Sequence, residues 1–333
     1  PTGGFGPRPQ KKISQPHGHP LWDWGIFPDD DNLMPDMKCA KWAVDQLSQK
    51  HDEPFFMGVG FYRPHVPMFA TKKWFDLHPK DKIKLPAVPS DDLKDLSQYA
   101  IDLTNLEHVS PTHGWVTGAG QWEHAVQSYL ASVTFADHCL GLVLDALEKS
   151  EYSDNTIITL FSDHGFHLGE KERWAKRSLW EDGTRVPIVV AAPGYKSGQM
   201  TNRPAELLDV FPTLLELAGL PKDETQEGQS LVPLMKDPKK EWNHPAITSF
   251  GLGNYSVRTT RYRFIQYFDG SRELYDLSKD PHEWKNLSDD PKNKSIIEEH
   301  AAHLPKKQHP ILPGKSTGHM AYGAANANIK DNH

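Results

Sequence analysis

The sequence predicts an α/β fold, with a mixed, largely parallel sheet sandwiched by helices and a small C-terminal antiparallel sheet. Continuous apolar runs at 55–61, 155–161 and 184–194 alternate with segments of helical periodicity, as in parallel sheets whose strands are buried on both faces. Beyond about residue 240 the apolar segments become short, β-branched and aromatic, and turn residues separate them. That second pattern is typical of an antiparallel sheet.

Four helices are predicted from apolar residues at helical spacing. The first, at 36–50, has Met37, Ala40, Val44 and Leu47 on one face. The other three are expected at 121–149, 205–218 and 295–303. A shorter helix is expected within 91–106, in a segment that otherwise reads as loop.

The domain organisation follows from these elements. We predict an α/β domain, then a small antiparallel sheet with one helix, then a polar tail, at 1–240, 241–303 and 304–333. The 333 residues are 37% hydrophobic and 24% charged, which is ordinary for a globular protein of this size.

Composition argues against several classes of protein. No run of 18 apolar residues occurs, so we expect no membrane span. The net charge of −7 argues against a nucleic-acid partner, because nucleic-acid binders are usually basic. The only two cysteines, Cys39 and Cys139, do not provide a disulfide framework.

The stretch FSDHGFHLGEKERWAK, residues 161–176, places charged side chains directly after a predicted strand. Ligands of α/β sheets bind beyond the carboxyl ends of the strands, where Asp163 and His164 stand. A carboxylate beside an imidazole can ligate a divalent cation. Lys176 is a cation suited to a sulfuryl or phosphoryl oxygen. Alone, the pattern is also compatible with an ordinary turn at a strand end.

A second cluster, YRPHVP at 62–67, also follows a predicted strand. Pro64 and Pro67 hold the backbone of His65 in an extended conformation, and its imidazole could donate a proton to a leaving oxygen. A rigid loop with a surface histidine is the alternative reading.

Together these stretches carry a family resemblance. SDHGFHLGEKERWAK followed by TRVPIVVAAPG resembles the signature of type I, formylglycine-dependent sulfatases of the alkaline phosphatase superfamily. GFYRPHVPMFATKKWFDLHP and YSVRTTRYRFIQYFDGSRELYDLSKDPHEWKNL are similar to the iduronate-2-sulfatase-like branch. The resemblance extends from about residue 20 to 290.

The resemblance implies roles for individual residues. Asp163 and His164 would be calcium ligands, and Asp163 would also polarise the nucleophile. Lys176 would hold the sulfate, and His65 would protonate the departing alcohol. The implied substrate is a sulfated polysaccharide or oligosaccharide.

Other residues of the same stretches are assigned less specifically. Arg63, His167 and Trp174 are candidates to contact the substrate. Glu170 and Arg173, on the same loop as His167 and Trp174, either line the sugar subsite or shape the loop.

The formylglycine motif of the family is absent from these 333 residues. Neither cysteine, and no serine, begins the pattern C-x-P-S-R or S-x-P-S-R. The early Asp-Asp pair that completes the family's calcium site is absent too. We expect the nucleophile and the first strands on an N-terminal segment of the same gene product.

Three alternatives stay open at this point. The chain could be a non-catalytic relative that binds sulfated glycan, or it could belong to a phosphodiester or phosphonate monoester hydrolase of the same superfamily. The resemblance also implies a periplasmic, secreted or lysosome-like location, although no signal segment is present to read.

Overall fold

The computed structural model describes residues 6–14, 21–104 and 110–307. These form two compact units, each treated by itself. Unit 1 takes its residues from 1–87 and 107–156, and unit 2 from 88–106 and 157–333. The division predicted at residue 240 stays a prediction, and most of the predicted tail lies outside the described residues.

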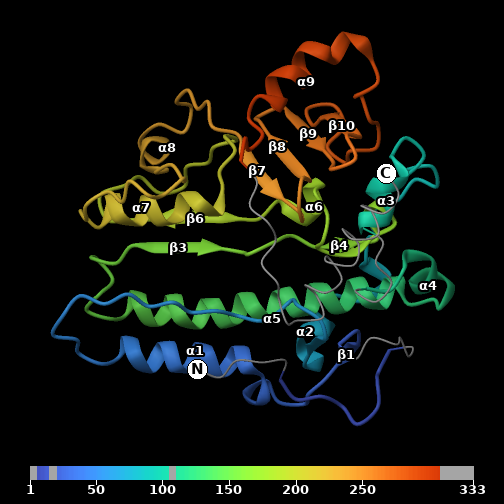
Figure 1. The fold of residues 1–333 in the computed structure, drawn as a ribbon. Helices are drawn as coiled ribbons and strands as arrows, with labels where there is room; N and C mark the ends of the chain where they lie inside the picture. Colours follow the sequence, from blue (N-terminus) through green and yellow to red (C-terminus); the bar gives the residue numbers. More distant parts are fainter. Residues whose placement is uncertain (1–5, 15–20, 105–109, 308–333) are drawn as a thin grey trace. The chain divides into compact units, whose positions relative to one another are not determined.

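The described residues of unit 1 form two strands and four α-helices, besides short 3-10 turns (Figure 1). They are β1 (Trp24–Ile26), α1 (Pro35–Leu47), β2 (Met68–Ala70), α2 (Lys72–Asp76), α4 (His113–Gly118) and α5 (Trp122–Glu148). The two strands are parallel, with Trp24 opposite Met68 and Ile26 opposite Ala70. Helices α1 and α5 confirm the segments predicted at 36–50 and 121–149.

The core of unit 1 forms where α1 and α5 pack side by side (Figure 1). Met37 and Ala40 of α1 meet Ala131, Phe135 and Cys139 of α5 in one buried cluster. The small alanines let the two helices approach closely while the larger side chains fill the space between them.

Helix α5 is also long and apolar enough to cross a membrane, judged by length and composition alone. Buried helices of water-soluble cores pass the same test, and Ala131, Phe135 and Cys139 of α5 lie in the core of unit 1. The expectation that the chain has no membrane span therefore stays a prediction.

Unit 2 contains a short strand pair, a small strand hairpin, a four-stranded sheet and several helices (Figure 1). Its strands are β3 (Ile158–Phe161), β4 (His167–Leu168), β5 (Trp174–Ala175), β6 (Ile188–Ala191), β7 (Ala246–Ser249), β8 (Tyr255–Arg258), β9 (Tyr262–Gln266) and β10 (Arg272–Asp276). Its helices are α3 (Gln98–Thr104), α6 (Glu181–Thr184), α7 (Val210–Leu217), α8 (Val232–Lys236) and α9 (Lys294–Ala301).

The C-terminal part of unit 2 is the predicted antiparallel sheet, in the order β10-β9-β8-β7. Val257, Phe264 and Leu274, one from each of β8, β9 and β10, are fully buried and form a cluster with Ile297 of α9. The short aromatic and β-branched segments thus predicted the sheet. Helices α7 and α9 confirm the segments predicted at 205–218 and 295–303.

The prediction of strands buried on both faces is wrong in detail. Residues 55–61 form no strand, and Phe56 is 86% exposed. The strands β3 and β6 do form, but they pair antiparallel, and Phe161 and Val189 are about half exposed. An apolar run indicates a strand but not what covers it, and Gly58 and Gly60 weaken the run at 55–61 further.

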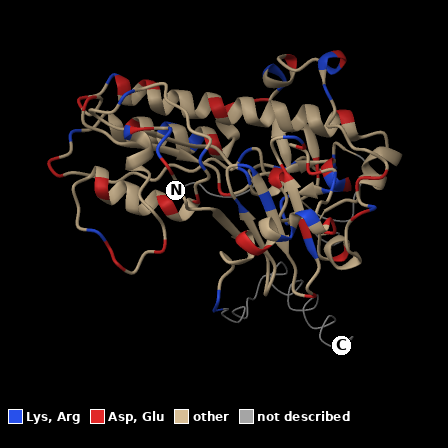
Figure 2. Ribbon diagram, turned by 90° about the horizontal axis from the view of Figure 1, so that it is seen from above, with Lys and Arg blue, Asp and Glu red and all other residues tan. Residues whose placement is uncertain are grey.

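Charged residues are spread over the described chain, with Lys and Arg interspersed among Asp and Glu (Figure 2). The same mixture reaches the interior of unit 2, where Lys171, Arg263 and Glu283 are almost completely buried. Buried charges are costly unless they are paired and hydrogen-bonded, so these three mark a part of the fold that needs a specific explanation.

Candidate active site

The loop that follows β3 passes close to α6 at Gly165. The Gly165 N–H donates to the carbonyl of Gly183, 3.1 Å away, which joins this loop to α6. A Cβ atom at position 165 would lie 2.1 Å from the carbonyl oxygen of Asp182. Only glycine therefore allows this close approach.

Asp163 and His164 lie together at the end of β3. The Nε2 atom of His164 is 3.5 Å from a carboxylate oxygen of Asp163, whose side chain is 82% exposed. His164 Nδ1 lies 2.7 Å from the carbonyl oxygen of Gly165. Because a carbonyl only accepts hydrogen bonds, Nδ1 carries the proton and Nε2 presents its lone pair. This donor set fits part of a divalent-cation site, since calcium takes about six to eight ligands.

Lys176 lies near Asp163. Partial burial lowers the pKa of Lys176, and the Asp163 carboxylate opposes that shift by raising it. The structure therefore brings together three of the residues singled out in the sequence, Asp163, His164 and Lys176. A carboxylate, an imidazole and an ammonium group in one place are suited to an anion held beside a cation.

The segment between His164 and Lys176 is a strained hairpin. Strands β4 and β5 pair antiparallel, with His167 opposite Ala175. Three non-glycine residues of the hairpin, Lys171, Glu172 and Ala175, have positive φ angles of 54°, 50° and 72°. Such conformations cost about 1 kcal/mol or more each, and they persist only where the surroundings enforce them.

Buried ionic contacts hold this hairpin in place. The Nζ atom of Lys171 is 2.6 Å from a carboxylate oxygen of Asp92, and both side chains are 2% exposed. Lys171 also donates to the carbonyl of Glu283. These contacts fix the turn that precedes Lys176.

Glu283 belongs to a second set of buried pairs. Its Oε1 atom is 2.7 Å from Nε of Arg263, and its Oε2 atom accepts from the N–H of Glu181 at 2.8 Å. Arg263 also pairs with the carboxylate of Glu181. Burial raises the pKa of Glu283 to about 7, although Arg263 acts in the opposite direction.

The sequence analysis did not identify these supporting residues. Asp92 lies near the start of the short helix expected within 91–106, in a polar segment that otherwise reads as loop, and Glu283 lies in DPHEWKNL, which entered only through the family resemblance. Charged residues in such segments look like solvated loop residues. Their burial depends on contacts with residues far away along the chain.

Two of the three predicted substrate-binding residues are completely buried. His167 and Trp174 are both 0% exposed. His167 Nε2 is 2.7 Å from Oγ of Ser178, and burial lowers the pKa of His167 to about 3. The role of His167 and Trp174 in substrate binding stays a prediction.

His65 and Arg63 belong to unit 1, whereas the residues of the hairpin belong to unit 2. His65 Nδ1 lies 2.6 Å from the carbonyl oxygen of Val66 and 2.7 Å from Oη of Tyr62. The carbonyl again requires the proton on Nδ1, so Nε2 is the nitrogen that can take up and return a further proton. This geometry is suited to the predicted proton transfer.

Arg63 is held by the start of α1 and by β2. Its backbone N–H donates to Asp36 at 2.9 Å, and its Nε atom donates to the carbonyl of Phe69 at 2.9 Å. The guanidinium is buried, which lowers its pKa. Arg63 therefore anchors the loop that carries His65, and its contact with substrate stays a prediction.

Comparison with known families identifies two matching models. The model described as Sulfatase matches residues 10–220. The model described as N-sulphoglucosamine sulphohydrolase, C-terminal, matches residues 169–310.

Curated relatives include several sulfatases. The chain is 42% identical to a sulfatase of Formosa agariphila, over 91% of this chain and 62% of that protein. It is 29% identical to the Delta 4,5-hexuronate-2-O-sulfatase of Bacteroides thetaiotaomicron, over 88% of this chain and 64% of that protein. It is 27% identical to human iduronate 2-sulfatase, over 78% of this chain and 63% of that protein. The chain thus spans less than two thirds of these relatives.

Solved structures support the predicted fold class. The phosphonate monoester hydrolase of Agrobacterium radiobacter matches with a TM-score of 0.73 and 22% identity, over 84% of this chain and 62% of that one. A 2-O GAG sulfatase matches with a TM-score of 0.64 and 24% identity, over 87% of this chain and 65% of that one. At this level of identity the likeness concerns the fold, and it confirms the α/β, alkaline phosphatase-like class.

Proposed function

The chain belongs to the sulfatase family, and from this premise we propose that the protein removes sulfate from a sulfated polysaccharide or oligosaccharide. The observation that carries the proposal is the grouping of Asp163, His164 and Lys176 at the end of β3, within the segment that matches the family. The names of the curated relatives support a carbohydrate substrate, since two of them are uronate 2-O-sulfatases.

In this proposal Lys176 binds an oxygen of the sulfate group. Its ammonium is partly buried, which lowers its pKa, and the Asp163 carboxylate acts on it in the opposite direction. Charge that develops on the sulfate oxygens during S–O cleavage would be stabilised by this preorganised cation.

His65 would protonate the leaving group. As the S–O bond breaks, the departing alcohol oxygen takes a proton, and Nε2 of His65 is the atom proposed to supply it. The contacts of Nδ1 with Val66 and Tyr62 support this role because they orient the ring.

A divalent cation, calcium in this proposal, would be held in part by Asp163 and His164, whose oxygen and nitrogen donors are 3.5 Å apart. When bound, the cation would neutralise part of the charge on the sulfate. The remaining ligands and the formylglycine nucleophile are proposed to come from an N-terminal segment of the same protein, because the 333 residues contain no formylglycine motif. The periplasmic, secreted or lysosome-like location stays a prediction.

The first test is sulfate release by the full-length protein. A 2-O-sulfated unsaturated uronate disaccharide is the first substrate to try, with an aryl phosphodiester as comparison. Lys176→Ala should lower kcat/KM by about 10²–10³-fold, because it removes one preorganised contact to developing charge. The matched control is Lys196→Ala, which removes an exposed lysine of the same unit and should leave the rate unchanged.

Three outcomes would contradict the proposal. Near-normal sulfate release by Lys176→Ala would remove Lys176 from the site. Faster turnover of the phosphodiester than of any sulfate ester would favour a phosphodiester or phosphonate hydrolase. Binding of the sulfated sugar without any turnover by the full-length protein would favour a non-catalytic glycan-binding protein.

A further inference from the structure

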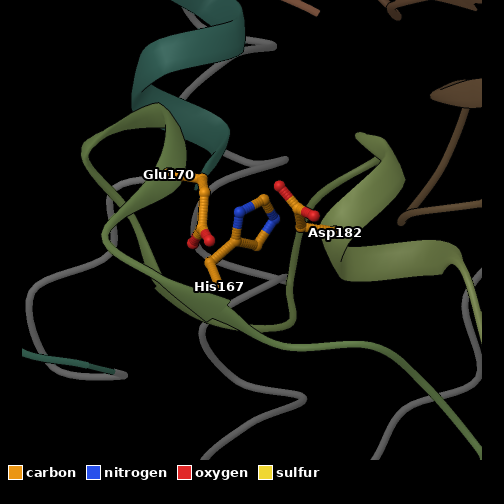
Figure 3. A group of neighbouring side chains, drawn as sticks. All are labelled: His167, Glu170 and Asp182. Atoms are coloured by element: carbon orange, nitrogen blue, oxygen red, sulfur yellow. The ribbon is translucent and has the colours of Figure 1, made fainter. Parts of the chain in front are cut away.

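A cluster of possible metal ligands lies beside the hairpin and is separate from the Asp163–His164 pair. It consists of His167 of β4, Glu170 of the hairpin turn and Asp182 of α6. One ring nitrogen of His167 and one oxygen from each carboxylate all lie within 4.8 Å of one another. Figure 3 shows the imidazole of His167 between the two carboxylates.

One nitrogen of His167 is buried without a hydrogen bond. The residue is 0% exposed, and its Nδ1 atom has no hydrogen bond of ordinary geometry among the described residues, although a contact of the ring with the backbone of Glu170 acts to raise the pKa of His167. A polar atom left in this state costs about 1–3 kcal/mol. Native proteins avoid that cost, so such an atom needs an explanation, and an ion is one of the recognised explanations.

The contact of the other nitrogen of His167, Nε2, indicates that Nδ1 is the atom available to a ligand. Nε2 lies 2.7 Å from Oγ of Ser178. If Nε2–H donates to the Ser178 hydroxyl, Nδ1 is unprotonated and presents its lone pair. This is the usual arrangement of a metal-binding histidine, whose second nitrogen is held by an outer hydrogen bond.

The backbone brings the two carboxylates to this histidine. The bond from Gly165 N–H to the carbonyl of Gly183 fixes α6 beside the loop that leads to His167. The N–H of Leu168 donates to Oε2 of Glu170 at 2.6 Å and orients that carboxylate. Two carboxylates held this close repel each other, and a cation between them would relieve the repulsion.

We propose that His167, Glu170 and Asp182 bind a divalent first-row transition ion of the zinc class, with water in the remaining positions. An imidazole nitrogen with two carboxylate oxygens in a set of few ligands suits such an ion, whereas calcium needs about six to eight ligands, most of them oxygens. Zinc distances of about 2.1 Å place tetrahedral donors about 3.4 Å apart, so a shift of about 1 Å would close the site. The ion would tie the hairpin to α6, and His167 would act on the ion rather than on the substrate.

Metal uptake by the 333-residue chain tests this proposal independently of enzymatic activity. The chain is stripped with a chelator and titrated with Zn²⁺ in excess Ca²⁺, and bound zinc is counted by mass spectrometry of the elements. We expect about one zinc per chain that calcium does not displace. A Co²⁺-loaded sample should show the visible absorption bands of a site with nitrogen and oxygen ligands.

Three variants identify the ligands. Asp182→Asn replaces an exposed carboxylate, and His167→Gln replaces a buried imidazole ring. Each substitution should weaken zinc binding by more than about tenfold. Glu172→Gln is the matched control, since it removes an exposed carboxylate of the same turn and should leave the affinity unchanged. Circular dichroism checks that each variant is folded, and Asp182→Asn keeps the test decisive if His167→Gln does not fold.

The proposal is overturned if no zinc is retained in the presence of calcium, or if Asp182→Asn binds zinc as tightly as the wild type. It is also overturned if Asp163→Asn, and not Asp182→Asn, abolishes zinc uptake. Failure of sulfate release would affect only the proposed function, because zinc uptake is measured without substrate.

Discussion

Two of the β-structures of unit 2, the C-terminal sheet and the β3–β6 pair, differ in how much of their apolar surface is covered. In the C-terminal sheet, Val257, Phe264 and Leu274 are completely buried. In the pair formed by β3 and β6, Phe161 is 48% exposed and Val189 is 54% exposed. Both structures are antiparallel and both are rich in apolar residues, so composition does not explain the difference.

We infer from this difference that the two structures have different roles in this chain. The C-terminal sheet makes its own core with α9, as Ile297 shows by packing in its cluster. The β3–β6 pair instead positions the loop that carries Asp163 and Lys176, and its apolar faces are only partly covered by the described residues. Exposed apolar strands of this kind are sites where further protein packs. The proposed N-terminal segment would supply that cover.

The largest expected effect separates the two regions by a matched pair of phenylalanines. Phe264→Ala should lower the free energy of unfolding by about 3–5 kcal/mol, because it opens a cavity in a closed core. Phe161→Ala should lower it by about 1 kcal/mol, because half of that ring already contacts water. Urea unfolding of both variants, made in the 333-residue chain without the proposed N-terminal segment, checks this. Equal losses would mean that β3 is covered in solution and that the comparison is wrong.

The next effect concerns Glu283, the buried carboxyl group that contacts Arg263 of the C-terminal sheet. Burial raises the pKa of Glu283 to about 7 in the fold, from an ordinary value of 4.5. The native state therefore binds this proton more tightly than the unfolded state does. The resulting stabilisation is fully present below about pH 4.5 and is lost as the pH rises through about 7, on the order of 3 kcal/mol in all.

Glu283→Gln tests this, because the amide stays neutral at every pH. Between about pH 5 and about pH 8, the wild type should lose more unfolding free energy than the variant. His167, whose pKa is lowered to about 3, acts in the opposite direction, since its stabilisation is lost as the pH falls below about 6.5. His167 titrates in both proteins, so the difference between their urea-unfolding curves isolates Glu283. Parallel pH profiles would contradict the prediction.

The smallest effect uses two valines. Val257→Thr buries a hydroxyl in the closed core of the C-terminal sheet and should cost about 1–3 kcal/mol. Val189→Thr places the same hydroxyl on the exposed face of β6 and should change stability by no more than about 0.5 kcal/mol. Thermal unfolding of the two variants measures the difference. A large loss from Val189→Thr would show that β6 is buried by something outside the described residues.

Periodicity and composition predicted most of the local structure. The helices α1, α5, α7 and α9 and the strands of the C-terminal sheet lie where the pattern placed them. These elements are recognisable because each has one face that packs within the chain, and that face repeats at the period of the element. The apolar run at 55–61 was misread because its composition resembles that of a buried strand, although Phe56 is exposed.

The chemistry of the site was predictable where the residues are neighbours in sequence. Asp163 and His164 are adjacent, and Lys176 is on the same short hairpin, so the motif together with the family resemblance indicated the group. The buried ion pairs that hold the hairpin in place were not predictable. Asp92 reaches Lys171 and Glu283 reaches Arg263 across long stretches of chain, and no local pattern marks such pairs.

Local periodicity and motifs of adjacent residues were enough to predict most of the secondary structure, the family and the polar residues that follow β3. Only the tertiary structure decided that His167 and Trp174 are buried and that the hairpin rests on ionic pairs. It also decided that the faces of β3 and β6 are partly open. Burial and ion pairing are properties of contacts between distant segments, and these contacts exist only once the chain has folded.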